Sequence, residues 1–372
     1  MGVAVYDVIV VGAGVTGSVA AQQLAAQHHK KVLVVEKGSA LGGMCQSYWD
    51  KSTGIEVHKY GTHVFHTNSS FIHDYVSKFC TLNGYQHKVL VWYNGKPYFL
   101  PINLLTMNSF FGSTYYTPQN PPPPEDIAAV KEAFYTGYSK KQWGVPLSEL
   151  PDDVLNRIPV RTDYNTRFFD AQYEGVPVNG WCKFFETILA HPKIEVKLNT
   201  PFEDLKKAAR KHKIPVVYTG RIDEYFEMLH GPLAWRAVSF NIHRYEDLQN
   251  YVVLGTAVMN FASVSDAHTR VHEYKYLHPE TFSSTKGTLL GYEYPSDGAS
   301  SDSLVAYPFK KKCGVDGGLG YKYLEMGMQE YRNFGVRFAG RLGTYSYINI
   351  DEAVSAGINA ANDVANWMKY GG

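Results

Sequence analysis

The sequence of 372 residues is short of cysteine, of net charge and of long apolar runs. Its four cysteines, Cys45, Cys80, Cys182 and Cys313, form no C-x-x-C pair, so we expect free thiols in a reducing compartment and no metal site. No apolar run approaches the roughly 20 residues that a spanning helix needs. The formal net charge of +1 gives no basis for a nucleic-acid surface or for binding to an anionic membrane. We therefore expect a cytoplasmic protein with no membrane span and no nucleic-acid partner.

The N-terminal segment has the pattern of a dinucleotide-binding unit. An apolar strand at 7–11 runs into three glycines and a helical segment that ends at about His28, and a second strand at 32–35 ends on an acid. In such a unit the glycines let a pyrophosphate approach the helix N-terminus, and the acid binds a ribose hydroxyl. The Gly42–Gly43 doublet that follows points to FAD more than to NAD. The residues of this unit assigned to the cofactor are Gly12, Gly14, Gly17, Glu36, Lys37 and Gly43.

The segment 56–67 is dense in His, Tyr and Gly. Its histidines, His58, His63 and His66, suggest a metal site, but no carboxylate or thiol pattern completes one. A loop lying against the cofactor is the preferred interpretation, with Gly61 allowing close approach of the backbone. Gly220, which follows a short apolar strand, is expected to face the cofactor from another turn.

A proline run at 121–124 cannot lie inside a helix or an inner strand, because prolines fix φ and remove hydrogen-bond donors. A predicted helix follows this run. Ile127, Val130, Phe134 and Tyr138 fall on one face of this helix. Tyr138 is therefore either a core aromatic or part of a binding site with the SKKQWG segment that follows. In that segment an aromatic ring, Trp143, and neighbouring cations suit a nucleotide base and its phosphates.

Arg157, Arg161 and Arg167 lie in a segment without helical or strand periodicity. They form either a solvated face or a diphosphate clamp, because a guanidinium group binds phosphate with two hydrogen bonds. Residues 235–295 alternate apolar and polar positions in several runs, which predicts an antiparallel sheet with one covered face.

The C-terminal segment has a strand that meets Gly340–Arg341 and a helix that starts near Asp351, an order similar to the closing strand and helix of FAD proteins. We predict an α/β fold with a Rossmann-like FAD-binding domain, an inserted small helical domain and an antiparallel sheet domain that contacts substrate. The FAD-binding domain comprises 1–75, 190–232 and 333–372, and the helical domain with a mobile substrate loop comprises 101–156. The sheet domain comprises 76–100, 157–189 and 233–332.

Six motifs, in order, resemble those of the prokaryotic UDP-galactopyranose mutase family. HKYGTHVFHT resembles HxYGxHxFHT, GYSKKQWG resembles GYTxKQWG, and RIPVR resembles RxPVR. YTGRIDEYF resembles YTGPIDxYF, HTRVHEYKY resembles YTRxxEHKxF, and AGRLGTYSYINID resembles GRLGTYxYxDMD. The resemblance covers nearly the whole chain and is more specific for the family than for the sugar.

The resemblance implies a flavoenzyme isomerase that interconverts pyranose and furanose nucleotide sugars, such as UDP-galactopyranose and UDP-galactofuranose, for cell-surface polysaccharides. In the family, N5 of reduced FAD attacks the anomeric carbon and expels the nucleoside diphosphate, and there is no net redox change. NAD(P)H or dithionite would serve only to reduce the flavin. A homodimer is also implied.

Roles for individual residues follow from the same resemblance. Arg157 and Arg270 would hold the diphosphate as catalytic cations, and His63 would lie beside the reactive face of the flavin. Trp143 would stack on the base, with Tyr138 beside it. The other substrate residues would be Phe168, Asn260, Tyr307, Tyr347 and Asn349. The other FAD-binding residues would be Gly61, His66, Gly220, Arg341 and Asp351.

The sequence departs from the family pattern at several positions. Phe168 stands where a tyrosine is usual, Arg167 where an asparagine is usual, Asn349 where an acid is usual and Arg221 where a proline is usual. The proline run also shortens the helical insert. These changes leave open a deoxy, acetamido or other hexose, on uridine or another base, and they leave the dimer contact open.

Two other classes of function compete with the mutase. A flavin oxidase or dehydrogenase of the amine-oxidase type shares the dinucleotide unit, but it gives no reason for Trp143, Arg157 and Arg270 at their spacings. A non-catalytic nucleotide-sugar binder would lack a tightly bound flavin.

Overall fold

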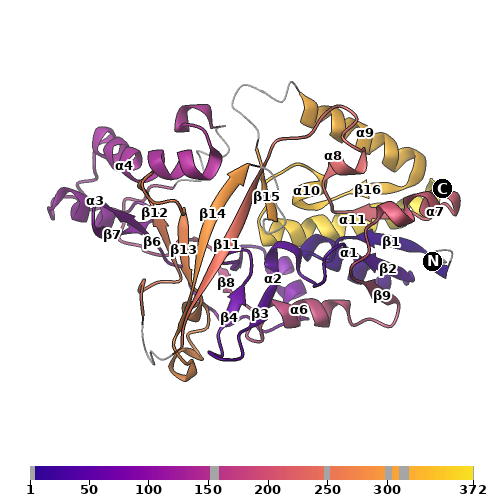
Figure 1. Cartoon of the computed structure of the whole chain (residues 1–372), viewed down its shortest axis with the longest axis horizontal. Coiled ribbons are helices and arrows are strands. Elements are labelled where there is room, and N and C mark those ends of the chain that lie inside the picture. Colours follow the sequence, from indigo (N-terminus) through magenta and orange to yellow (C-terminus); the bar gives the residue numbers. More distant parts are fainter. Residues whose placement is uncertain (1–4, 151–158, 247–251, 298–303, 310–317, 372) are drawn as a thin grey trace.

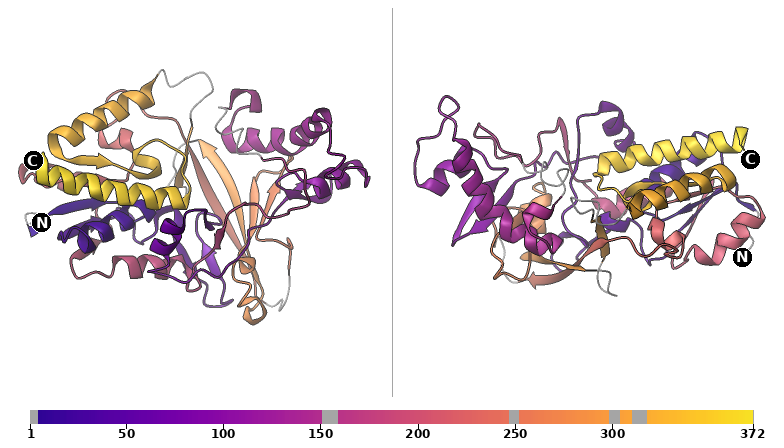
Figure 2. Two further views of the ribbon diagram at one scale, coloured as in Figure 1. Left: turned by 180° about the vertical axis from the view of Figure 1, so that it is seen from behind. Right: turned by 90° about the horizontal axis from the view of Figure 1, so that it is seen from above.

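The computed structural model of the chain describes residues 5–150, 159–246, 252–297, 304–309 and 318–371. Two large sheets lie beside each other in this part of the chain, one parallel and one mostly antiparallel (Figure 1). Both termini lie at the end formed by the parallel sheet, whereas helices α3 (Leu104–Phe111) and α4 (Pro124–Trp143) lie at the opposite end (Figures 1 and 2). The predicted α/β fold class is confirmed.

The first sheet contains five parallel strands among the described residues, in the order β16–β10–β1–β2–β9. Their bounds are β1 Val8–Val11, β2 Val32–Val35, β9 Ile194–Lys197, β10 Val216–Tyr218 and β16 Val336–Phe338. Strands β1, β2 and β10 are built almost wholly from apolar residues and are almost fully buried, because helices cover both faces of the sheet. The apolar runs predicted as buried parallel strands are therefore confirmed.

Helices cover this sheet from both sides and bring the two ends of the chain together. Those of one face are α1 (Val15–Ala26), α6 (Gly180–Leu189) and α11 (Ile350–Tyr370), and those of the other are α7 (Glu203–Lys211), α8 (Ile222–Tyr225) and α9 (Leu319–Phe334). Helices α1 and α11 approach closely at Gly357, where a Cβ would lie 2.6 Å from the carbonyl oxygen of Thr16. Segments from both ends of the chain thus share one core.

The second sheet has seven strands within the described ranges, in the order β15–β11–β14–β13–β12–β6–β7. Neighbours are antiparallel except β12 and β6. The bounds are β6 Val89–Tyr93, β7 Lys96–Leu100, β11 Trp235–Tyr245, β12 Val258–Phe261, β13 Arg270–Glu273, β14 Thr288–Asp297 and β15 Leu304–Pro308. The smaller elements are β3 Ser47–Trp49 with β4 Glu56–His58, β5 Phe65–Thr67 with β8 Tyr173–Gly175, and helices α2 Ser70–Val76 and α10 Gly340–Gly343. The predicted antiparallel sheet is confirmed.

Helix α4 packs its predicted apolar face on the second sheet. Val130 and Phe134 belong to the core that includes residues of β6 and β12, and Tyr138 is 8% exposed on the same face. The helix begins at Pro124, because a proline at the first helical position loses no intrahelical hydrogen bond. Gly144, with φ of +73°, ends it directly after Trp143.

Two helices pack on a different sheet from the one we expected. Helix α6 falls in 157–189, and all but the last two residues of α9 fall in 233–332. Both ranges were assigned from the sequence to the antiparallel sheet domain, but both helices pack on the parallel sheet. An amphipathic pattern identifies a buried helix face but not the sheet that will cover it. The domain boundaries as a whole stay a prediction.

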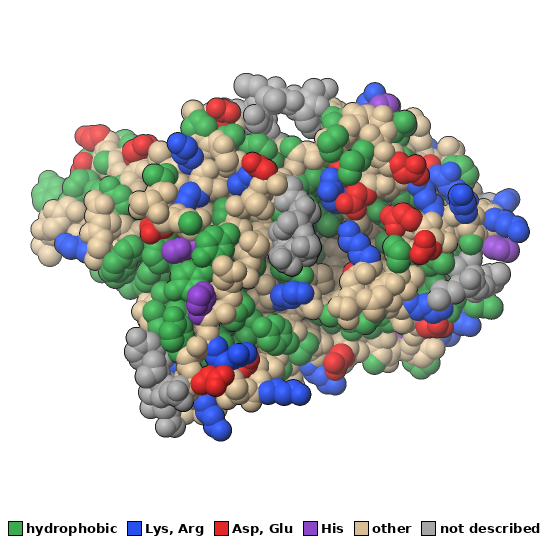
Figure 3. All heavy atoms as spheres, viewed as in Figure 1, with side chains coloured by type: hydrophobic (Ala, Val, Ile, Leu, Met, Phe, Trp, Pro, Cys, Tyr) green, Lys and Arg blue, Asp and Glu red, His purple; other side chains and the backbone are tan. Residues whose placement is uncertain are grey.

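The surface differs between the two ends of the molecule. On the face drawn in Figure 3, hydrophobic side chains gather over the second sheet, whereas both signs of charge are interspersed over the first. In the ranges that the structure describes, no helix combines the length and the apolar character needed to cross a membrane.

Candidate active site

The glycine turn after β1 leaves a helix N-terminus open to an anion. Gly12 has φ of +95°, and a Cβ there would lie 2.2 Å from Thr219 Oγ1. A Cβ at Gly17 would lie 2.0 Å from the carbonyl oxygen of Gly12. Gly14, the N-cap of α1, provides no capping side chain, and the first turn of α1 holds no acid. The first N–H groups of the helix therefore have no side-chain cap within the described residues. This cradle fits the diphosphate of a dinucleotide.

Glu36 ends β2 beside the same turn. Its Oε2 accepts a hydrogen bond from the Ala13 N–H at 2.9 Å, and its Oε1 accepts one from the Gly38 N–H at 2.7 Å. The carboxylate therefore lies where the ribose of a dinucleotide would follow the diphosphate. Lys37, by contrast, is exposed, and its Nζ lies 3.7 Å from Glu224 of α8.

Two further glycines predicted to contact the cofactor lie close to this turn. A Cβ on Gly43, in the second glycine pair, would lie 3.1 Å from Gly14 Cα, so the two glycine segments touch through their backbones. Gly220 lies two residues after the end of β10, where a Cβ would meet the hydroxyl oxygen of Tyr218 at 2.8 Å. The structure thus brings together the glycines that were predicted from separate parts of the sequence.

Arg341 connects the glycine segment to the C-terminal turn and to β15. Its Nη1 donates to the Ala306 carbonyl oxygen at 3.1 Å and contacts Met44 Sδ at 3.2 Å, and its Nη2 donates to the Ile348 carbonyl oxygen at 2.6 Å. The guanidinium group lies 4.5 Å from the ring centre of Tyr347. A cation is therefore held beside the dinucleotide-binding turn.

Asn349 and Asp351 start helix α11 in addition to any role toward a ligand. Asn349 is the N-cap residue, and its backbone N–H donates to Glu352 Oε2 at 2.7 Å. Asp351 lies in the first turn, where a negative charge stabilises the helix dipole. Both residues were assigned to ligands from the sequence, and the helix start predicted near Asp351 is confirmed.

The histidines of segment 56–67 are used for internal contacts. His63 Nδ1 lies 2.7 Å from the Gly61 carbonyl oxygen, and burial lowers the pKa of His63 to about 3, so its ring is neutral. His66 stacks on Phe169 with ring centres 3.7 Å apart. Among the described residues, no group of three His, Cys, Asp or Glu side chains is placed to hold a metal ion.

A row of polar side chains crosses the inner face of the second sheet. Asn260 on β12, Arg270 on β13 and Glu293 on β14 are direct cross-strand neighbours, and Phe240 on β11 continues the row. Residues opposite each other in a sheet project to the same face. Asn260 Oδ1 and Glu293 Oε1 are buried without a hydrogen-bond partner among the described residues, as is the hydroxyl of Tyr138. Unpaired buried polar atoms are costly, so this row is suited to a polar ligand.

Arg270 is the charged centre of this row. Its Nη1 lies 3.5 Å from Glu293 Oε2, and its guanidinium group lies 5.7 Å from the ring centre of Tyr138. Burial disfavours the charged form of Arg270, but Glu293 and the neighbouring tyrosines raise its pKa well above the usual value. The same pairing with Arg270 and His272 lowers the pKa of Glu293 despite its burial. Burial raises the pKa of Tyr138 to about 12, so its hydroxyl keeps its proton.

Aromatic rings from three separate segments lie together, and two of them, Tyr307 and Tyr347, interact electrostatically with Arg270. Trp143, at the end of α4, stacks on Phe309 with ring centres 6.0 Å apart and meets the edge of Tyr307 at 5.8 Å. Tyr307 stacks on Tyr347 at 5.5 Å. Such a platform suits a nucleotide base, which binds aromatic rings through its π face.

Phe168 belongs to a second aromatic cluster that contains His66. Its ring centre lies 5.1 Å from that of Phe169 and 5.7 Å from that of His87. Burial lowers the pKa of His87 to about 3, and the charge of Arg270 contributes to that shift. Nearby, Arg167 Nη2 lies 2.8 Å from Glu174, which is 8% exposed as a residue. Arg167 is thus engaged with a buried acid, and the proposed arginine clamp does not include it.

The structure assembles most of the predicted site residues, with some omissions. Arg157 lies outside the described residues. Glu293 and Phe309 were not predicted from the sequence, and His272 was assigned no role. A signal for His272 existed, because Arg270 and His272 are two apart on a strand and must share a face.

Comparison with known proteins identifies relatives of the whole chain. A family model described as UDP-galactopyranose mutase matches residues 133–347, and one described as an NAD(P)-binding Rossmann-like domain matches residues 10–80. The chain is 31% identical over 378 residues to a probable UDP-galactopyranose mutase of Klebsiella pneumoniae, an alignment covering 96% of this chain and 94% of the relative. It is 30% identical over 380 residues to the dTDP-fucopyranose mutase of Escherichia coli. That alignment covers 95% of this chain and 97% of the relative.

The fold has a matching neighbour among solved structures. A crystal structure of reduced UDP-galactopyranose mutase superposes with a TM-score of 0.66 at 15% identity, covering 97% of this chain and 96% of that one. The family suggested by the six motifs is therefore confirmed by sequence, and its fold is confirmed by structure. The chain belongs to the UDP-galactopyranose mutase family and is an enzyme of the isomerase type.

Proposed function

We propose that the chain interconverts the pyranose and furanose forms of a nucleotide sugar, UDP-galactopyranose or a close variant of it. The observation that carries the proposal is the placement of Arg270. The Arg270 side chain is 30% exposed and lies beside Tyr138 and the buried Glu293. Its charge also interacts with Tyr307 and Tyr347 of the aromatic platform that contains Trp143. A charged group held at such a site suits the diphosphate of a nucleotide sugar.

FAD is the cofactor that fits the dinucleotide-binding turn. Gly12, Gly14, Gly17 and Gly43 would leave room for its diphosphate, and Glu36 would bind its ribose. When bound and reduced, FAD supplies the nucleophile, its N5, for the anomeric carbon of the sugar. Lys37, Gly61, His66, Gly220, Arg341 and Asp351 are the further residues that we assign to the cofactor.

The residues of the chain itself bind, orient and stabilise charge. Arg270, with Arg157 from outside the described residues, would stabilise the charge that develops on the leaving diphosphate. Trp143 and Tyr138 would bind the base, and Tyr307 and Tyr347 would donate to phosphate oxygens. Asn260, Phe168 and Asn349 would contact the sugar.

His63 contributes a hydrogen-bond acceptor at this site. Its neutral ring donates from Nδ1 to Gly61, which leaves the lone pair on Nε2. Because N5 of FAD would be the nucleophile, the site would need no protein nucleophile paired with a general base. The protein would act through position and electrostatics.

An assay of the reduced holoenzyme against several nucleotide sugars tests the proposal. The panel contains UDP-galactopyranose, UDP-N-acetylgalactosamine and dTDP-fucopyranose, because the Escherichia coli relative bears the last name. We expect a furanose product by anion-exchange chromatography, turnover only after reduction by dithionite or NAD(P)H, and no stoichiometric consumption of NAD(P)H.

The same assay discriminates the competing function. A flavin oxidoreductase of the amine-oxidase type would consume one electron acceptor per substrate molecule and would release an oxidised product. Stoichiometric oxidation without furanose formation would refute the mutase.

We also propose a homodimer, which sedimentation analysis of the purified chain tests.

A further inference from the structure

Two buried histidines hold the backbone of the loop that carries His63. His58 Nδ1 accepts a hydrogen bond from the His63 backbone N–H at 3.0 Å. His272 Nδ1 accepts one from the backbone N–H of Thr62 at 3.3 Å, and it lies 3.0 Å from the Thr62 hydroxyl oxygen. The two histidines are 1% and 2% exposed and come from different sheets, β4 and β13. Consecutive N–H groups of one loop are thus bound from two sides.

A buried carboxylate faces the other nitrogen of each histidine ring. Glu293 Oε2 is hydrogen-bonded to His272 Nε2 at 3.1 Å. Glu56 Oε2 lies 3.3 Å from His58 Nε2, without the alignment of a hydrogen bond. Because Nδ1 accepts in both rings, the single proton of each neutral ring must be on Nε2, toward the acid. Each acid therefore favours the tautomer that leaves Nδ1 able to accept.

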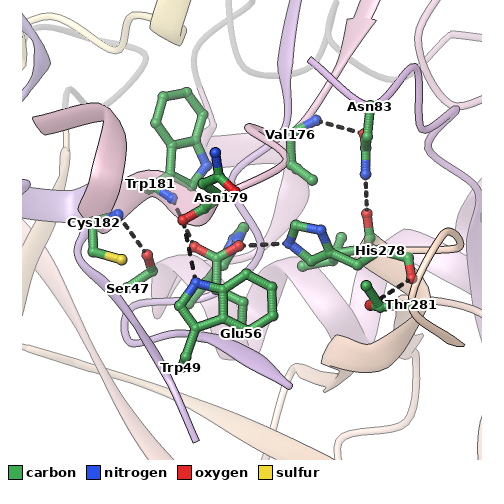
Figure 4. Close-up of polar contacts among 12 residues, drawn as sticks. Ser47, Trp49, Glu56, Asn83, Val176, Asn179, Trp181, Cys182, His278 and Thr281 are labelled. Carbon is green, nitrogen blue, oxygen red and sulfur yellow. Dashed lines mark hydrogen bonds and ion pairs between the residues drawn. The ribbon is translucent and has the colours of Figure 1, made fainter. Parts of the chain in front are cut away.

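Glu56 is itself fixed by the element that also holds His63. Its Oε1 accepts from the Trp181 backbone N–H at 2.7 Å, and its Oε2 is bonded to His278 Nε2 at 2.7 Å (Figure 4). The indole N–H of Trp181 donates to the His63 carbonyl oxygen at 2.9 Å. Although burial opposes ionisation, the hydrogen bond with His278 lowers the pKa of Glu56, so the acid is charged. The carboxylate and the loop are thus tied to one residue at the start of α6.

The loop is also pressed against the sheet face that bears Arg270. Gly61 has φ of +87°, and a Cβ there would lie 3.1 Å from Phe240 Cζ and 3.4 Å from His272 Cε1. The Gly61 carbonyl oxygen lies 2.7 Å from His63 Nδ1, which fixes the proton of that ring on Nδ1 and the lone pair on Nε2. Among the described residues, Nε2 of His63 makes no hydrogen bond, so it is available to a ligand.

We propose that His58 and His272 are positioning residues: they hold the N–H groups of His63 and Thr62, so that the His63 ring presents its Nε2 lone pair to the cofactor and the substrate. The group that the Nε2 lone pair would contact depends on the proposed function. The orientation of the His63 ring does not depend on it. His58 and His272 act through His63 and touch neither cofactor nor substrate.

Matched variants at both histidines test the proposal. His272→Asn and His58→Asn keep an acceptor near the position of Nδ1, whereas His272→Leu and His58→Leu keep similar bulk and remove the acceptor. The main readout is the ring ¹⁵N spectrum of His63 in the flavin-loaded protein labelled at histidine, with His63→Gln used to identify its signals. We expect one Nδ1–H tautomer in the wild-type and Asn variants, and mixed tautomers in the Leu variants. Turnover of the Leu variants should fall about tenfold, the factor that corresponds to 1.4 kcal/mol, with little change in KM.

Several results would overturn the proposal. One is a Leu variant that retains FAD, the single His63 tautomer and wild-type turnover. Another is equal loss in the Asn and Leu variants, which would indicate packing alone. Hydrogen exchange in the wild-type protein provides a measurement that needs no variant: fast exchange of the Thr62 and His63 amides would contradict the two hydrogen bonds. If the His63 tautomer shifts as expected but no nucleotide sugar is isomerised, the proposed function fails and the positioning role stands.

Discussion

Replacing Arg270 by alanine perturbs the charged centre of the proposed site. The substitution removes the guanidinium group from the row formed with Asn260 and Glu293. It also leaves Glu293, which is 2% exposed, with His272 as its remaining charged or polar side-chain partner among the described residues. The diphosphate would then meet a buried acid in place of a cation.

The expected loss follows from the change of charge at this position. Removing one group that stabilises developing negative charge costs about 2.7–4 kcal/mol, or about 10²–10³ in kcat. Two unit charges about 4 Å apart interact by about 4 kcal/mol at an effective dielectric constant of about 20, which is of the same order. Because Glu293 adds repulsion when Arg270 is absent, we expect a loss near the upper end, about 10³ in kcat.

The assay compares the variant with one matched control. Flavin content is measured from the visible absorbance, turnover from the furanose product of the dithionite-reduced enzyme, and the Kd of the free nucleoside diphosphate by calorimetry. Arg210→Ala is the control, because Arg210 pairs with Glu330 at 2.8 Å between α7 and α9, away from the row. We expect normal flavin content in both variants and near-normal turnover in the control.

A clear result would refute the reasoning. If Arg270→Ala retains flavin and its kcat stays within a few-fold of the wild-type value, Arg270 does not stabilise the leaving diphosphate. A fall of equal size in Arg210→Ala would show that loss of any arginine ion pair disturbs the fold, and it would remove the evidence for a specific role.

Three more predictions address the cofactor, the base and one buried histidine, His87. Gly17→Ala should abolish FAD binding, because its Cβ would lie 2.0 Å from a carbonyl oxygen of the glycine turn; a purified variant with the wild-type flavin content would contradict this. Trp143→Ala should raise the Kd of the nucleoside diphosphate about tenfold or more, since base stacking contributes about 1–3 kcal/mol, and an unchanged Kd would exclude stacking there. His87 is neutral in the fold, where its pKa is lowered to about 3, but titrates near pH 6.5 when unfolded. The unfolded state therefore binds more protons, and the free energy of unfolding should fall as the pH drops from about 6.5 toward 3. His87→Gln should reduce this decline between about pH 7 and 5 by on the order of 2 kcal/mol in urea titrations, whereas identical slopes would refute the assignment.

The sequence predicted those parts of the site whose geometry is local. The contacts of Gly17 and Glu36 arise within one strand–turn–helix–strand unit, so spacing alone identifies them. The helix face of Tyr138 was predictable from periodicity. In each case the interacting residues are close in the chain.

Other features of the site depend on pairings between distant segments. Phe309 stacks on Trp143, although the two residues are far apart in the sequence. Glu293 pairs with Arg270 through strand register. Strand register decides which side chains share a face, and no local pattern in β13 or β14 specifies it. The Trp181 contacts that fix Glu56 and His63 likewise bring α6 to β4.

The sequence by itself identified a dinucleotide-binding unit, the family to which the chain belongs, and the cations and aromatic rings that we assign to a nucleotide sugar. These properties depend on residue type and on short spacings, which the chain carries before it folds. The tertiary structure alone decided which residues surround Arg270, which sheet α6 and α9 cover, and how His58 and His272 hold the loop of His63. Those arrangements depend on contacts between residues far apart in the chain, which form only when the two sheets pack together.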